Sequence, residues 1–399
     1  MQDEIVQKGR QYLANTYNRF PIVITKGEGC WIWDMSGRRY LDFLSGIAVC
    51  NLGHVHQDVL EGLVTQAGKL FHISNLFFIE PQIKAAEILV QNSFGDKVFF
   101  CNSGAEANEA AIKLARRYSW NKYGKGRNEI IAMDNSFHGR TMATLTATGQ
   151  KKFHEGFAPL LEGFSYVPFN DIDAVKKAIN EKTCAIITEV IQAEGGVYPG
   201  GKEYINALRE ITKEQDILLI IDEVQTGIGR TGKLFAYEHY DIEPDIMTLA
   251  KALGNGFPVG AMIAKDAVMD AFVPGTHAST FGGNPLASSA VVATLSIIAY
   301  EGILKNCEAV GLYLYEGLLS LQKEYPFITD IRGMGLIWGI ELSVNGDEVL
   351  KEFMNEGVII NCTKGNILRL LPPLIIRKEE VDIFLEIAKK IFEKWLKKN

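Results

Sequence analysis

Three polar groups follow apolar, strand-like stretches of this chain. Lys251 comes directly after the run IMTLA, Asp222 ends the run ILLIID, and the segment SGAE (residues 103–106) follows KVFFCN. In open α/β proteins, ligands bind at the carboxyl ends of parallel strands. We therefore expect a lysine, a carboxylate and the start of a helix to share one edge of a sheet.

Each group also has a simpler interpretation. Ser103 and Glu106 fit a capping box, in which each side chain accepts a hydrogen bond from an N–H group at a helix start. Asp222 fits a turn residue at the end of a strand, and a lone lysine at a strand end is usually solvated. The spacing favours a shared site, because the 29 positions from Asp222 to Lys251 suit one strand–helix–strand crossover.

The combination matches the needs of pyridoxal 5′-phosphate. This cofactor requires a lysine for a Schiff base, an acid beside its pyridinium nitrogen and a cradle for its phosphate. A dry pocket lowers the pKa of a lysine amine and makes it a nucleophile. Lys251 and Asp222 are the candidates for the first two roles. The helix start after Ser103, with Gly104 and Ala105, is the candidate for phosphate binding.

A competing pattern lies at residues 227–234, GIGRTGKL. It contains G-x-G-x-x-G and nearly matches a P-loop, which would indicate a nucleotide-binding protein. A P-loop needs Ser or Thr after its lysine, whereas Leu234 stands there. The glycines also follow the preceding strand too late for a strand–helix turn. We therefore predict a flexible surface turn.

The order of elements predicts an α/β fold with a mostly parallel sheet. Strand-like runs alternate with helical patterns through the middle of the chain, which is typical of βαβ units. The predicted strands lie at 97–102, 129–133, 184–190, 217–222 and 245–250. After about residue 290 the pattern changes to a long helical stretch reaching about Tyr325, a hairpin at 330–342 and a helix at 378–397, which predicts a smaller α+β domain. The expected division is an N-terminal segment (1–55) packing with the small domain, a large cofactor-binding domain (56–295) and a small C-terminal domain (296–399).

Composition narrows the function classes. The chain has 399 residues, 47% of them apolar and 22% charged, which suits a large folded core. A net charge of −7 argues against nucleic acid as a partner. None of the six cysteines forms a C-x-x-C pair. With no signal-like N-terminus and no membrane-length apolar run, these features predict a cytoplasmic enzyme with reduced thiols and no membrane partner.

Many motifs, in order, resemble one family. From about Tyr17 to Val381 the chain is similar to class III aminotransferases, pyridoxal-phosphate enzymes of fold type I. The matching stretches are NTYNRFPIV, GRRYLDFLSGIAV, SGAEANEAAIKLAR, SFHGRT, DEVQTGIGRTG, LAKALGNGFPVGA, STFGGNPLA and LRLLPPL. Within the family, NSFHGRTMATLTATGQ and HASTFGGNPLA are most similar to members that act on N-acetylornithine.

The resemblance implies roles at numbered positions. Lys251 is implied to form the Schiff base and then to move a proton as general base and acid. The implied cofactor-binding residues are Ser103, Gly104, Ala105, Phe137, Asp222, Glu223, Val224, Gln225, Lys251 and Thr280. The implied substrate-binding residues are Tyr17, Arg140, Glu194, Ser279 and Arg369. Thr280 is implied to reach the phosphate of a second subunit, so a homodimer with shared active sites is expected.

The expected reaction is transfer of the distal amine of N-acetylornithine to 2-oxoglutarate, a step of arginine biosynthesis. Arginines suit carboxylate substrates, and Glu194 is implied to neutralise Arg369 in one half-reaction and release it in the other. Other ω-amino donors remain open: ornithine, succinylornithine, succinyldiaminopimelate and 4-aminobutyrate. An aminomutase acting on glutamate semialdehyde is a further alternative.

Three positions depart from the family's usual pattern. Val190 replaces a proline and Ala193 a glycine beside Glu194, so a differently shaped turn is possible there. Asn255 stands where glycine is common, and asparagine tolerates a left-handed backbone better than most residues. His54 and His56 could suggest a metal pair, but without further ligands nearby we expect no metal site.

Overall fold

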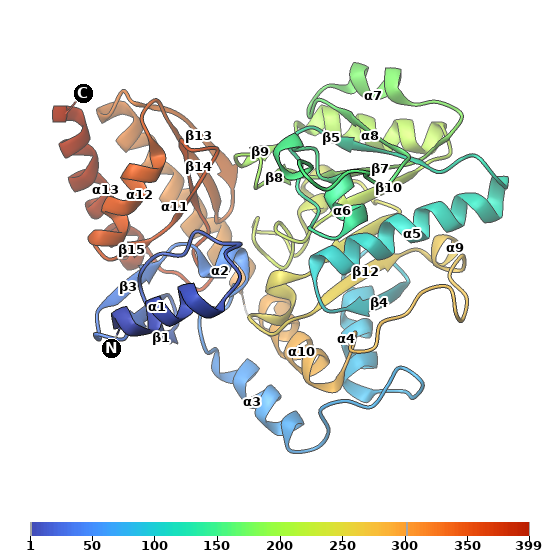
Figure 1. The fold of residues 1–399 in the computed structure, drawn as a ribbon, viewed down its shortest axis with the longest axis horizontal. Helices are drawn as coiled ribbons and strands as arrows, with labels where there is room; N and C mark the ends of the chain where they lie inside the picture. The colour runs from blue at the N-terminus through green and yellow to red at the C-terminus, as the bar shows by residue number, and fades with distance from the viewer. Residues whose placement is uncertain (1, 301, 399) are drawn as a thin grey trace.

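A seven-stranded sheet forms the centre of the larger part of the molecule. The computed structural model describes residues 2–300 and 302–398 (Figure 1). The strand order is β4 (Lys97–Cys101), β12 (Gly260–Ala264), β11 (Ile246–Leu249), β10 (Leu218–Asp222), β7 (Thr183–Glu189), β5 (Glu129–Met133) and β6 (Phe164–Val167). Among the described strands of this sheet, β12 alone runs in the direction opposite to the other six. The predicted, mostly parallel α/β sheet is confirmed.

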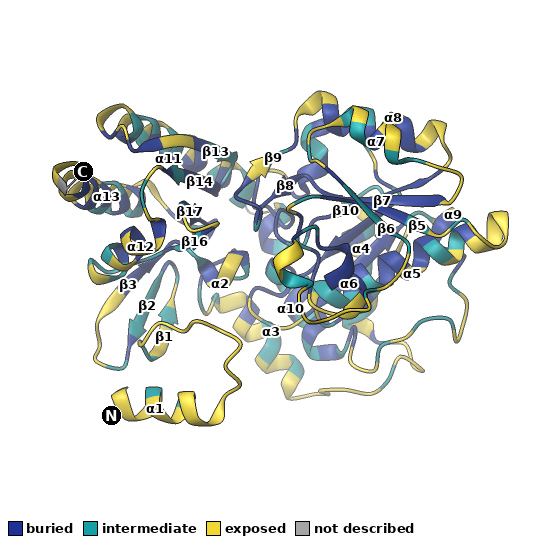
Figure 2. Cartoon of the chain, turned by 45° about the horizontal axis from the view of Figure 1, so that its top comes forward, coloured by how far each residue is buried: buried dark blue, intermediate teal, exposed yellow. Residues whose placement is uncertain are grey.

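Helices cover both faces of this sheet because its strands are apolar on both sides. Ile130 packs in one cluster with α5 (Gly104–Tyr123), and its neighbour Ile131 packs in another with α8 (Lys202–Glu214). Successive residues of a strand point to opposite faces, so α5 and α8 lie on opposite sides. The strands are buried between these layers (Figure 2).

The other helices of the larger part are short or lie at its edge. They are α3 (Gln57–Ala67), α4 (Glu80–Gln91), α6 (Met142–Ala147), α7 (Ile172–Ala178) and α9 (Asp266–Met269). Three 3₁₀ turns, η1 (Lys151–Phe153), η2 (Ala236–Tyr240) and η3 (Lys251–Gly254), and a hairpin of β8 (Ile191–Gln192) with β9 (Tyr198–Pro199) complete it. α3 packs against α10 (Pro285–Tyr300), and α4 packs against α10 and the edge strand β4.

The N-terminal and C-terminal segments build the second part together. One sheet contains β1 (Ile24–Glu28), β2 (Trp31–Asp34), β3 (Arg39–Asp42) and β15 (Val358–Ile359). The other contains β13 (Ile328–Met334), β14 (Ile337–Leu342), β17 (Ile367–Leu370) and β16 (Asn361–Thr363). Helices α1 (Gln2–Tyr12), α2 (Ser45–Ala48), α11 (Ile303–Glu324), α12 (Gly346–Asn355) and α13 (Lys378–Lys398) accompany them. Because β15 pairs with β3, chain segments far apart in sequence share one sheet; the domain limits at 55 and 295 stay predictions.

The long helical stretch predicted to end near Tyr325 is two helices. α10 (Pro285–Tyr300) packs under the larger sheet, and α11 starts after Gly302, whose φ of +80° suits glycine. Within residues 2–300 and 302–398, no single helix has the length and apolarity to cross a membrane. The pair of α10 and α11 has enough length and apolarity for a membrane span, judged by length and composition only. The two helices are bent by 64° relative to each other.

The predicted surface turn at 227–234 is wrong. Seven of its eight residues are buried, and Lys233 is exposed. Arg230, with no exposed surface, donates from Nη1 to the carbonyl oxygens of Leu336 (3.0 Å) and Pro372 (2.5 Å), and from Nη2 to Asn51. The loop is therefore buried, and its hydrogen bonds connect the two parts of the molecule.

The connection from Asp222 to Lys251 differs from the predicted crossover helix. It contains only the 3₁₀ turn η2 before β11 begins. β10 and β11 are nevertheless parallel neighbours, with Asp222 opposite Thr248. Both strands therefore end at the same edge of the sheet, as predicted.

Candidate active site

A cavity of about 450 Å³ lies at the carboxyl ends of the central strands. The predicted site residues in its wall are Ser103, Gly104, Ala105, Phe137, Arg140, Asp222, Val224, Gln225 and Lys251. They come from the start of α5, the segment after β5, the segment after β10 and the start of η3. The fold thus brings together residues that are up to 148 positions apart in the chain.

Lys251 lies in the cavity wall at the first position of η3. Its φ is +46°, an uncommon left-handed conformation for a residue with a side chain. Within the described chain, Nζ has no hydrogen-bond acceptor or ion-pair partner in contact. Burial is the main cause that lowers the pKa of Lys251 to about 8, and the positive charge of Arg369 acts in the same direction. The site therefore favours a neutral, reactive amine near physiological pH.

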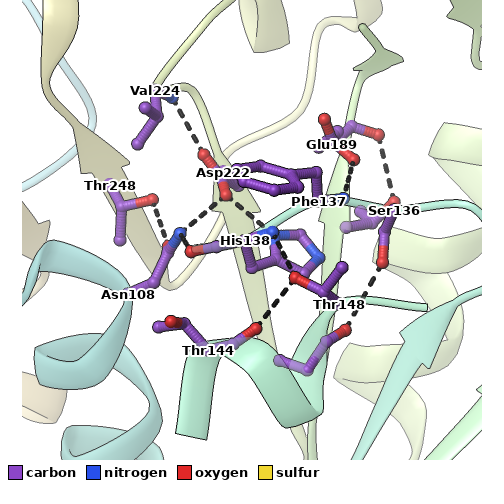
Figure 3. A network of polar contacts seen from close by, with 12 residues as sticks. Asn108, Ser136, Phe137, His138, Thr144, Thr148, Glu189, Asp222, Val224 and Thr248 are labelled. Atoms are coloured by element: carbon purple, nitrogen blue, oxygen red, sulfur yellow. Dashed lines mark hydrogen bonds and ion pairs between the residues drawn. The ribbon is translucent and has the colours of Figure 1, made fainter. Parts of the chain in front are cut away.

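Asp222 is held by three hydrogen bonds in a buried network (Figure 3). Its Oδ2 accepts from Nδ2 of Asn108 and pairs with Nδ1 of His138, both at 2.7 Å, and its Oδ1 accepts from the backbone N–H of Val224 at 2.9 Å. Asn108 is oriented in turn by Thr248, whose hydroxyl donates to Oδ1 at 2.7 Å. Oδ2 has two hydrogen-bond partners in this network and Oδ1 has one. Oδ1 can therefore accept a further hydrogen bond from a ligand in the cavity.

Sequence reasoning missed both Asn108 and His138. Asn108 is buried among the mostly apolar buried residues of α5, and a buried amide must find partners. His138 has a fully buried side chain, and its Nε2 has no partner among the described residues. Because Oδ2 of Asp222 is an acceptor, Nδ1 of His138 carries the proton in their contact.

The start of α5 differs in detail from the predicted capping box. Ser103 Oγ accepts from the N–H of Glu106 at 3.2 Å, as predicted. The Glu106 carboxylate accepts instead from the backbone N–H of Asn102, one residue before the cap, at 2.5 Å. Among the described residues, the N–H groups of Gly104 and Ala105 have no acceptor, and both residues line the cavity. Two free N–H groups at a helix start suit an anion.

Glu189 is a further acidic group in the cavity wall that the sequence did not single out. Its Oε2 accepts from the backbone N–H of Phe137 at 3.1 Å. Burial, with the charge of Asp222 adding to it, raises the pKa of Glu189 well above its usual value.

Arg140 lies over the ring of Phe153, its Cζ 3.9 Å from the centroid.

Glu194 and Arg369 form an ion pair beyond the cavity wall. Nη1 of Arg369 donates to Oε1 of Glu194 at 2.6 Å and to Oε1 of Gln225 at 3.0 Å. The Arg369 side chain has no exposed surface, whereas that of Glu194 is 27% exposed. Burial alone would raise the pKa of Glu194, but the positive charges of Arg369 and Lys251, with hydrogen bonds from Arg369 and Gln225, lower it.

The three departures from the family pattern are accommodated. Val190 and Ala193 are both fully buried beside the turn, and Glu194 still reaches Arg369. Asn255 has φ +43°, and its Oδ1 accepts from the N–H of Leu52 at 2.8 Å. Asparagine therefore suits this left-handed position, as predicted.

Besides Glu194 and Arg369, four predicted residues lie away from the cavity wall. Glu223 is buried with its carboxylate bonded to Thr226 Oγ1 and the N–H of Tyr237, and burial raises its pKa to about 7. Ser279 and Thr280 line a neighbouring hollow of about 340 Å³. Tyr17 is 69% exposed. The roles expected of these residues stay predictions.

The chain is similar to aminotransferases over nearly its whole length. Residues 12–392 match the family model "Aminotransferase class-III". Acetylornithine aminotransferase of Caldanaerobacter subterraneus subsp. tengcongensis is 53% identical over 379 residues, covering 95% of this chain and 96% of that protein.

Solved structures agree with this similarity. An ornithine aminotransferase from Toxoplasma gondii, described with partial occupancy of PLP at its active site, superposes with a TM-score of 0.95 at 32% identity, over 99% of this chain and 94% of that one. Acetylornithine aminotransferase from Elizabethkingia anophelis gives a TM-score of 0.89 at 34% identity, over 98% and 99% of the two chains. This chain therefore belongs to the class-III aminotransferases.

Proposed function

We propose that this aminotransferase uses pyridoxal 5′-phosphate to move the distal amino group of N-acetylornithine to 2-oxoglutarate. One observation carries the assignment. A single cavity holds the amine of Lys251 without an acceptor, the ionisable oxygen Oδ1 of Asp222 and the free N–H groups at the start of α5. These are the three groups that the cofactor needs.

The residues in the cavity fit this cofactor. Asp222 Oδ1 would accept from the protonated ring nitrogen, and the N–H groups of Gly104 and Ala105 would bind the phosphate. Phe137 and Val224 supply apolar surface in the same wall for the ring. When bound, the cofactor supplies an electron-withdrawing ring that stabilises negative charge on the donor carbon.

Lys251 has two tasks in this proposal. Its Nζ would hold the cofactor covalently until a substrate amine displaces it. The freed Nζ would then accept the proton that leaves the substrate carbon and donate it at the cofactor's former aldehyde carbon. A pKa of about 8 places the amine where it can accept and donate a proton near neutral pH.

Asp222 would accept the hydrogen bond from the protonated ring nitrogen. The donors from Asn108, His138 and Val224 hold its carboxylate in place for that contact. The same network fixes the direction of Oδ1.

The substrate carboxylates would be bound by Arg140 and Arg369, with Ser279 and Tyr17 as further contacts. Arg369 is neutralised by Glu194 at 2.6 Å, which suits a donor with one carboxylate. The acceptor 2-oxoglutarate has two carboxylates, so Glu194 would move aside to release Arg369. In Glu194→Ala, the donor and acceptor half-reactions should change unequally, and equal losses in both would reject this switch.

The donor assignment is supported by the relatives. The curated relative at 53% identity is an acetylornithine aminotransferase, whereas the ornithine aminotransferase structure shares 32% identity. A donor panel tests the assignment: N-acetylornithine, ornithine, succinylornithine, succinyldiaminopimelate and 4-aminobutyrate, each with 2-oxoglutarate. N-acetylornithine should have the highest kcat/KM. A higher value for ornithine would instead favour an ornithine aminotransferase.

A homodimer is part of the proposal. The segment 70–78 exposes Phe78 at 98%, Leu76 at 87% and Phe71 at 61% of their surfaces. Monomers rarely expose contiguous apolar surface of this kind, which is typical of protein interfaces. We expect sedimentation of the purified chain at twice its monomer mass, with Thr280 reaching the partner's phosphate. A monomer with full activity would contradict the shared site.

A further inference from the structure

The turn that carries Glu194 is strained and needs support. It joins β8 to β9, and Val197 within it has φ +57° with no exposed surface. A β-branched residue in the left-handed region is an outlier that persists only where its surroundings hold it. The turn lies against β13 and β14 of the second part of the molecule (Figure 1).

Three paired residues of β13, β14 and β17, namely Arg332, Gly339 and Arg369, form the surface on which this turn lies; we call this surface the seat. Arg332 of β13 pairs with Gly339 of β14, which pairs with Arg369 of β17. Directly paired residues point to the same face, so both arginines leave one face, about 10 Å apart at twice the strand spacing. Gly339 leaves room between them: a Cβ there would lie 3.0 Å from Val197 Cβ.

Arg332 contacts the turn from the side opposite Arg369. Its Nε donates to the carbonyl oxygen of Gly196 at 2.9 Å, and its Cζ lies 3.7 Å from the centroid of the Tyr198 ring. Its Nη1 is anchored at 2.6 Å by Asp330 and by Glu341. The guanidinium is therefore fixed to the small sheet and bonded two residues beyond Glu194.

We propose that Arg332 is a positioning residue that sets the pairing of Glu194 with Arg369 and thereby the selectivity between substrates with one and two carboxylates. This rests on the proposed function of that ion pair. Arg369 takes the Glu194 side chain at one end of the seat, and Arg332 holds the Gly196 carbonyl oxygen at the other. Without Arg332 the turn loosens, Glu194 spends less time on Arg369, and a second ligand carboxylate competes better.

Ligand binding tests this proposal without turnover. Glutarate has two carboxylates and pentanoate has one on a chain of the same length, and neither carries a reactive amine or ketone. Calorimetric titration of the cofactor-loaded enzyme gives the ratio of their affinities. For Arg332→Met the ratio should shift toward glutarate by about threefold to tenfold, the size expected for partial loss of a charged hydrogen bond. Arg332→Lys, which keeps the charge but not the fork of donors, should shift it in the same direction.

Two comparisons distinguish positioning from a general structural role. The effect of Arg332→Met on the ratio should vanish in a Glu194→Ala background, because the residue acts through Glu194. Asp330→Ala is the matched control: it removes one anchor of Arg332 but leaves Nε on Gly196, so the ratio should stay unchanged. Equal weakening of both ligands in the two Arg332 variants, or the same shift in both backgrounds, would overturn the proposal. Failure of the donor panel would leave this ratio intact, so the two proposals fail separately.

Discussion

Replacing Asn108 with aspartate tests the buried network around Asp222. In the wild type, Asn108 Nδ2 donates to Asp222 Oδ2 at 2.7 Å and to the carbonyl oxygen of His138 at 2.8 Å. Asn108→Asp keeps the shape but puts an oxygen where that donor stood. Two carboxylates would then share one buried site.

The charges set the size of the effect. At 2.7 Å and an effective dielectric constant of about 20, two like charges repel by about 6 kcal/mol. Taking up a proton at pH 7 costs a carboxyl of ordinary pKa only about 4 kcal/mol. The variant pair therefore binds a proton when folded, and the new O–H donates to Asp222. The folded state then holds one more proton than the unfolded chain, so the free energy of unfolding falls by about 1.4 kcal/mol per pH unit.

Denaturant unfolding between about pH 5.5 and pH 7.5 measures this slope relative to wild type, with an expected extra loss of about 2.7 kcal/mol at the higher pH. Asn108→Leu is the control, because it removes the donor without adding charge. Asn108→Leu should lose about 2 kcal/mol of unfolding free energy, the value for a hydrogen bond to a charged group, and this loss should not vary with pH over this range. If Asn108→Asp shows no pH dependence beyond that of Asn108→Leu, Asp222 is not ionised in the network described.

Further predictions concern three other groups. The rate at which the cofactor-free chain captures pyridoxal phosphate should rise with pH through about 8, where Lys251 loses its proton, and a flat absorbance-monitored rate would contradict that pKa. His54 pairs with Asp42 at 2.7 Å, chiefly by a hydrogen bond that raises its pKa from 6.5 to about 10. The stability from this pair is fully present below pH 6.5 and lost as pH rises through about 10, so Asp42→Asn should reduce the free energy of unfolding more at the lower pH. Arg230→Ala should cost about 3 kcal/mol or more in denaturant unfolding, because it leaves buried carbonyl oxygens unpaired and a cavity behind.

The strand pattern was enough to locate the main chemistry. Apolar runs that end in Asp222 and Lys251 predicted two parallel neighbours with a common edge, and the register of β10 and β11 confirms it. The local signals were strong, since each buried strand is continuous in sequence. The hairpin at 330–342 and the helix at 378–397 were predicted for the same reason and correspond to β13, β14 and α13.

Contacts between distant segments could not be predicted in this way. Nothing near Arg230 in sequence indicates that Leu336 and Pro372 provide carbonyl oxygens, so its loop was mistaken for a surface turn. Asn108 and His138 likewise become meaningful only when α5 and the segment after β5 meet at Asp222. Burial of a polar side chain is a tertiary property, and an amphipathic pattern reports it only by an exception within an apolar face.

Borohydride reduction shows whether Lys251 is the residue that binds the cofactor covalently. The purified chain is loaded with pyridoxal phosphate, reduced, digested and analysed by peptide mass spectrometry, with Lys251→Ala as the control. We expect one dominant phosphopyridoxyl label on Lys251, with loss of that label in the control. An unlabelled Lys251, or an equal label on another lysine, would contradict it.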